Sequence, residues 1–171
     1  MFTSKLIYGI TVWGAVWGIP GDLDQEKRRS ISTTKEDMRK LQVLQNKALR
    51  LYLRKPYDTP TSDLLLLSNQ LSVHQLVAYH SAVQVFKIRE SQKPSYHFER
   101  LFARSQSSRY SSSSTEANRI DYEISLARNS FFFQASRIWN SLPQPVQLSR
   151  NVNTFKSSCK TWVKRNIAMR P

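Results

Sequence analysis

The spacing of apolar and polar residues predicts a helix in the first third of the chain. Thr33 and Glu36 have the spacing of a capping box, and the helix that they open should run to about Leu53, before Pro56 stops it. One face of this helix carries an apolar stripe that we expect to face the core: Leu41, Leu44, Ala48 and Leu51. Another face carries a basic stripe: Lys40, Lys47, Arg50 and Arg54.

Two further helices follow from the same periodicity. Ser72 with Gln75 forms a second capping box, and Lys93-Pro94 should end the helix that it opens. The apolar positions of that helix are Leu76, Tyr79, Val83 and Phe86. The last helix, about Asn153 to Ile167, should turn Phe155, Cys159, Trp162 and Val163 toward a core. Its other face repeats Lys156, Lys160 and Lys164 at four-residue spacing, with Arg165 beside them.

A short helix is also predicted from Ala135 to Leu142, where Pro143 lacks the amide that would continue it. Ile138, Trp139 and Leu142 lie on or near one face of that helix. An aromatic residue on such a stripe usually packs in a core, so we interpret Trp139 as a core residue.

The rest of the pattern predicts at most one short β-hairpin and one linker. Residues Asp121 to Leu126 alternate as a strand does, and Phe131 to Phe133 could supply its partner. Residues 104–119 are dominated by serine and bury too little to order themselves, which predicts a flexible linker. We therefore expect a mainly α-helical protein, divided into a helical region 1–103, the linker 104–119 and a C-terminal region 120–171.

The apolar segment from Leu6 to Ile19 allows two interpretations. Its length is below the roughly 20 apolar residues that span a bilayer. A signal peptide is the alternative, but Lys5 is the only positive charge before the apolar run, and Trp13 and Trp17 are bulky for a cleavage site. We favour a buried helix and expect no membrane insertion.

The net charge of the sequence indicates what kind of partner it binds. The 171 residues carry a formal net charge of +14, and no acidic residue follows Glu123. An unpaired basic segment repels itself unless anions are near, so nucleic acid is the leading partner class. The lone Cys159 excludes an internal disulfide, and His74, His80 and His97 show no metal-ligand spacing. No metal or cofactor is expected, and the cysteine content suits an intracellular location, in the nucleus or the cytoplasm.

Four motifs in order resemble the C-terminal, post-palm region of reverse transcriptases from non-LTR (LINE-type, jockey- or CR1-like) retrotransposons. They are Leu6 to Gly14, Leu41 to Arg50, Pro60 to Leu64 with Leu71 to Leu76, and Ser130 to Pro143, with Phe155-Lys156 and the last helix after them. Two stretches depart from the family pattern. Residues 19–35 are longer and more charged than its usual connection, and residues 104–115 are unusually rich in serine.

The resemblance implies a thumb-like helical region without the polymerase palm. Polymerase chemistry needs a carboxylate cluster that holds two magnesium ions, and no Asp-Asp pair occurs in this sequence. We therefore expect no enzymatic activity. In the family, this region would help to hold RNA and DNA near the polymerase, which makes the missing polymerase portion a second expected partner.

The predicted site consists of basic residues that contact phosphates: Lys40, Lys47, Arg50, Arg54, Lys156, Lys160, Lys164 and Arg165. No base-reading motif accompanies them, so binding should be nonspecific. Two alternatives stay open at this point. One is a basic protein-interaction or membrane-surface module, and the other is a degenerate reading frame without a selected function. The sequence leaves the oligomeric state and the choice between RNA and DNA undetermined.

Overall fold

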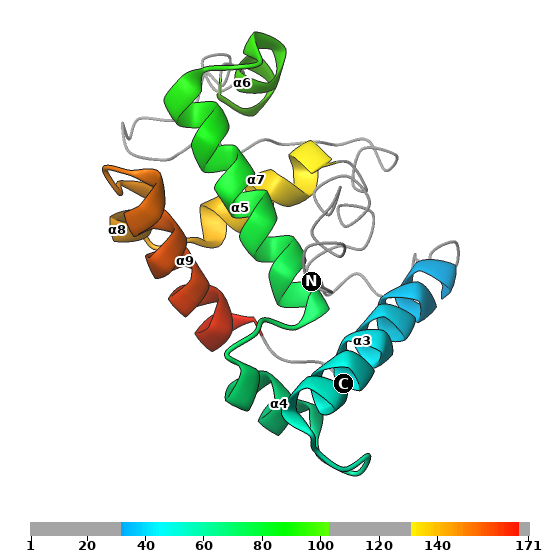
Figure 1. The fold of residues 1–171 in the computed structure, drawn as a ribbon. Coiled ribbons are helices and arrows are strands. Elements are labelled where there is room, and N and C mark those ends of the chain that lie inside the picture. The colour runs from blue at the N-terminus through cyan, green and yellow to red at the C-terminus, as the bar shows by residue number, and fades with distance from the viewer. Residues whose placement is uncertain (1–31, 103–130, 168–171) are drawn as a thin grey trace.

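The computed structural model describes residues 32–102 and 131–167, and within these ranges it is built from α-helices without a strand (Figure 1). The helices are α3 (Ser32–Leu53), α4 (Thr61–Ser68), α5 (Val73–Ser91), α6 (Ser95–Phe102), α7 (Phe131–Ser141), α8 (Gln144–Gln147) and α9 (Val152–Asn166). The predicted mainly α-helical class is therefore confirmed. The predicted linker 104–119 and the N-terminal apolar segment lie outside the described residues.

Local signals place the ends of these helices as the sequence indicated. Helix α3 ends at Leu53, and Arg54 then adopts a left-handed conformation with φ 51° two residues before Pro56. Ser72 caps α5 through a complete capping box, in which its side chain accepts from the Gln75 amide and the Gln75 side chain accepts from the Ser72 amide. Both predicted helices are confirmed.

Helix α5 is central to the fold, and α7 and α9 both pack against it (Figure 1). Helix α9 runs antiparallel to α5, as contacts at both ends show. At one end Gln75 Nε2 donates to the Ile167 carbonyl (2.9 Å), and at the other Arg89 Nη1 donates to the Gln147 carbonyl (2.7 Å). Residues from both sides of the predicted linker thus share one core.

That core is centred on aromatic rings from three helices. Phe86 of α5 stacks on Phe155 of α9 with ring centroids 4.4 Å apart, and Phe155 stacks in turn on Trp139 of α7 at 5.9 Å. Ile138 and Leu142 are buried beside them. The prediction that Ile138, Trp139 and Leu142 line the core is confirmed.

The strand suggested for Phe131 to Phe133 is wrong, because these residues form the first turn of α7. Phe132 is buried, and its ring contacts Tyr96 and His97 of α6 at centroid distances of 5.8 and 5.2 Å. Packing against a neighbouring helix therefore overrides the β-propensity of three successive aromatic residues. The suggested partner strand, Asp121 to Leu126, lies outside the described residues.

The core-facing side of α3 also differs from the prediction. Leu44 and Leu51 are exposed (50% and 82%), whereas the polar side chains of Gln42, Gln45 and Asn46 are buried. Their side-chain amides hydrogen-bond to one another and to residues in and around α4 and α5. Two residues of the predicted apolar stripe, Leu44 and Leu51, therefore lie on the surface, while Leu41 and Ala48 are half-buried.

Candidate nucleic-acid interface

The basic row of α9 begins with a well-defined helix start. The Asn151 side chain accepts from the Thr154 amide (2.8 Å), which fixes the first turn. Phe155, Cys159 and Val163 are then buried at helical spacing. Because that face is held in the core, the adjacent row of lysines is fixed along the helix edge: Lys156, Lys160 and Lys164, all half-buried.

Two members of the predicted α9 set differ from the others. The Lys164 ammonium donates a hydrogen bond to Oδ1 of Asn69, the residue that caps the C-terminus of α4. Lys164 therefore helps to join α9 to α4. Arg165 is exposed and lies about 100° around the helix from Lys164, so it does not belong to the same row.

The basic side chains of α9 have no acidic partner among the described residues. The helix itself contains no Asp or Glu, and the ion pairs found in the described ranges all lie on α3 and α5. Lys40 on α3, by contrast, pairs with Asp37 at 3.6 Å. Lys156, Lys160 and Lys164 thus form a row of positive charge without an acidic partner among the described residues, and such a row can attract an anion.

His80 reveals a further lysine that the sequence did not single out. Burial lowers the pKa of His80, and the positive charges of Lys156 and Lys87 lower it further. Lys87 of α5 and Lys156 of α9 therefore lie close enough to influence one imidazole. Lys87 lies seven residues after His80 on α5, whereas Lys156 acts on His80 because α9 packs against α5, which no sequence spacing indicates.

The predicted basic residues of α3 are placed differently from those of α9. Lys40 and Lys47 are exposed, and Arg54 is exposed just beyond the end of the helix. Arg50 is half-buried: its Nη2 donates to the Thr59 carbonyl (2.9 Å), and its guanidinium lies 5.2 Å from the centre of the Tyr57 ring. Arg50 therefore secures the loop between α3 and α4.

Helix α4 stands between the two predicted basic groups. It packs against α3, and its cap at Asn69 receives the bond from Lys164 of α9 (Figure 1). The structure thus brings Lys156, Lys160 and Lys164 into one row, while Lys40 and Lys47 belong to a different helix that α4 separates from it.

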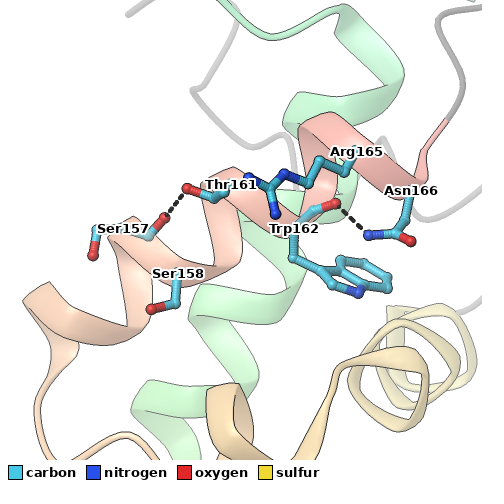
Figure 2. A pocket seen from close by; sticks show the side chains of 6 residues that line it. All are labelled: Ser157, Ser158, Thr161, Trp162, Arg165 and Asn166. Carbon is cyan, nitrogen blue, oxygen red and sulfur yellow. Dashed lines mark hydrogen bonds between the residues drawn. The ribbon is translucent and has the colours of Figure 1, made fainter.

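Trp162 of α9 is partly exposed as well as packed against the core. Trp162 packs against the core, as the sequence predicted, but it is only half-buried and also lines a surface pocket together with other α9 residues (Figure 2). The signal was present in the sequence, because Ser158, Thr161, Trp162 and Arg165 have the spacing of one helix face.

The described residues do not meet the requirements of a metal site, a reactive cysteine or a membrane span. No group of three His, Cys, Asp or Glu side chains there is arranged to hold a metal ion. Burial raises the pKa of the Cys159 thiol to about 12, so that thiol stays protonated and unreactive at neutral pH. None of the described helices combines the length and the apolar character needed to cross a bilayer.

The fold and this site define a class: a helical protein with an uncompensated basic helix edge. Comparisons with protein-family models, curated proteins and solved structures found no match.

Proposed function

We propose that this chain binds RNA and DNA without sequence preference, through contacts between the lysines of α9 and nucleic-acid phosphates. The observation that carries the proposal is the row of Lys156, Lys160 and Lys164 without an acidic partner among the described residues. The motif order supports the same function, because it resembles the post-palm region of a non-LTR retrotransposon reverse transcriptase, of which this chain would be a non-catalytic C-terminal fragment.

Partial burial makes these lysines better suited to phosphate binding than freely mobile ones. Each side chain is half-buried, so part of its freedom is already restricted before a phosphate is bound. Lys87 of α5 adds a positive charge that acts on His80, as Lys156 does. Phosphate contacts carry no sequence information directly, so we expect similar affinity for different sequences.

The salt dependence of binding tests the proposal. If about five phosphates of duplex DNA are neutralised, the logarithm of the affinity should fall with log salt at a slope of about −4.5. Lys156→Gln with Lys160→Gln should flatten that slope by up to about 1.8, since each contact contributes about 0.9. We leave Lys164 unchanged in this variant because it also bonds Asn69.

A matched variant controls for the loss of net charge. Lys55→Gln with Lys93→Gln removes the same charge from two exposed residues outside α9. This variant should keep the parental slope. Equal slopes for the two double variants, or no binding by the parent protein at low salt, would refute the α9 site.

The absence of catalysis is part of the same proposal. Because the sequence lacks adjacent aspartates, we expect no nucleotide incorporation on a primer-template with magnesium or manganese. Incorporation that persists through further purification would contradict the non-catalytic fragment.

The exposed face of α3 favours a second candidate, a protein-interaction module. Val43, Leu44 and Leu51 are exposed on the helix that also exposes Lys40 and Lys47. Apolar area mixed with lysine suits a partner helix that offers leucine flanked by glutamate, rather than a phosphate backbone. Charge complementarity therefore commits this candidate to an acidic amphipathic protein segment.

A synthetic acidic amphipathic peptide tests the second candidate. The parent should bind it, and Leu44→Ser with Leu51→Ser should abolish binding while leaving the salt slope for DNA unchanged. Displacement of DNA by the peptide would place both ligands on one surface and contradict separate sites. Preferential binding of α3 to anionic lipid vesicles, lost in the same variant, would replace the protein partner with a membrane surface.

A further inference from the structure

A pocket of about 400 Å³ lies on α9, on the side that the lysine row does not occupy (Figure 2). Its described lining comes from one helix: Ser157, Ser158, Thr161, Trp162, Arg165 and Asn166. The volume is near the lower end of the range of about 300 to 1,000 Å³ that is typical of small-ligand sites. The lining combines an aromatic ring, a cation and hydroxyl groups.

Trp162 supplies a surface on which a flat ring can stack. It packs partly against the core, which holds the indole in place, and it also lines the pocket. Trp139, by comparison, is only 3% exposed and is covered on its face by Phe155. Trp162 is therefore the tryptophan of the described ranges that a ligand can reach, and nucleobases stack well on such rings.

Arg165 supplies a positive charge one turn away from Trp162. It is exposed and has no ion-pair partner among the described residues. In Figure 2 its side chain points back along α9, toward the turn that carries Thr161 and Trp162. The guanidinium can therefore attract the phosphates of a strand that crosses this part of α9.

The hydroxyl groups of Ser157 and Thr161 influence how a ligand is oriented in the pocket. Ser157 Oγ donates to the Thr154 carbonyl, and Thr161 Oγ1 donates to the Ser157 carbonyl, each at 3.0 Å. Because their hydrogens are used within the helix, these oxygens face a ligand as acceptors. Base amino groups and sugar hydroxyls can donate to them, whereas a phosphate cannot. Arg165 is the cation of the described lining and can bind the phosphate.

From these observations we infer that the α9 pocket holds one unstacked nucleotide of a single strand, with its base on Trp162 and its phosphate on Arg165. This inference rests on the proposed nucleic-acid binding and adds a preference to it. Bases inside a duplex are stacked on their neighbours and cannot reach the indole. Single strands should therefore gain a contact that duplexes of the same length lack.

Two substitutions at Trp162 separate stacking from packing. Trp162→Phe keeps an aromatic ring, while Trp162→Leu keeps apolar volume against the core without one. The affinity of a 12-nucleotide oligothymidine should fall at least about fivefold in the Leu variant and much less in the Phe variant. Duplex affinity and its salt slope should stay as in the parent for both variants.

An NMR measurement on the unchanged protein covers the case in which the Leu variant does not fold. On addition of oligothymidine, the indole N–H signal of Trp162, assigned with the Phe variant, should shift, and that of buried Trp139 should not. Equal single-strand affinity of the parent and the Leu variant, or no shift at Trp162, would overturn the pocket. If the parent binds duplex with the expected slope, only the pocket fails. If it binds neither form, the proposed function fails as well.

Discussion

Trp139 shows how one residue ties three helices together. Its ring stacks on Phe155 of α9, and the guanidinium of Arg89 from α5 lies 5.3 Å from its centre. Arg89 also donates to the Gln147 carbonyl, beyond the end of α7. Sequence periodicity placed Trp139 in the core, but the cation above its ring comes from a distant segment and could not be predicted.

Trp139→Ala should lower the free energy of unfolding by about 3 to 5 kcal/mol, because it leaves a cavity among packed rings. Urea denaturation followed by circular dichroism measures the change. Alkylation of buried Cys159 provides a second measure, since its thiol should react rapidly only when the core opens. A variant that keeps the parental stability and loses nucleic-acid affinity would make Trp139 a binding residue.

The lowered pKa of His80 predicts how the stability of the protein depends on pH. Burial, and then Lys156 and Lys87, lower its pKa in the folded state below the ordinary 6.5. Between that lowered pKa and about 6.5 the unfolded chain binds the proton more readily. Stability should therefore fall as the pH drops through this window. His80→Gln should remove that part of the pH dependence in urea titrations.

The same imidazole can report on phosphate binding. A phosphate at Lys156 would offset the lysine charge, so duplex DNA should raise the pKa of His80 in an NMR titration. Lys156→Gln should also raise it, without DNA. An unchanged His80 pKa at saturating DNA would place the phosphates away from Lys156.

At the scale of an element, α3 explains why periodicity identified a helix but not its buried face. The chain between α4 and α5 presents the Leu71 carbonyl and the Val73 amide, which need partners once they are buried. Gln45 Nε2 donates to the first (2.8 Å), and Gln42 Oε1 accepts from the second (2.9 Å). Both backbone groups belong to another segment of the chain, so the residue pattern within α3 could not predict that Gln42 and Gln45 face the core.

Matched substitutions on α3 test whether its buried face carries Gln45 and its exposed face carries Leu44. Gln45→Ala should cost about 1 to 3 kcal/mol of stability, because it leaves the buried Leu71 carbonyl without a partner. Leu44→Ser, on the exposed side, should change stability by no more than about 0.5 kcal/mol. Urea midpoints would show the difference. A larger loss of stability for Leu44→Ser than for Gln45→Ala would show that the leucine face is the buried one, as the sequence predicted.

At the scale of the whole molecule, described helices from both sides of residues 103–130 pack into one core. Capping boxes and prolines predicted where α3 and α5 lie, and residue spacing predicted α9, because those signals are local. The pairing of α5 with α7 and α9 depends on contacts between residues far apart in the chain, such as Phe86 with Phe155. The lysine row and the polar face that carries Trp162 could be predicted from spacing, whereas the influence of Lys156 on His80 of α5 follows only from that pairing.

A split chain tests whether the two regions form one folding unit. Residues 1–103 and 120–171, produced together as separate polypeptides, should copurify, because α7 and α9 bury their apolar faces on α5. Phe86→Ala should separate them, since Phe86 is fully buried and stacks on Phe155 across the junction. Tyr57→Ala, at an exposed ring outside that junction, is the control and should leave them together. Size-exclusion chromatography measures the association. Two regions that elute apart, each with the helical circular dichroism of its own segment, would show independent domains that need no shared core.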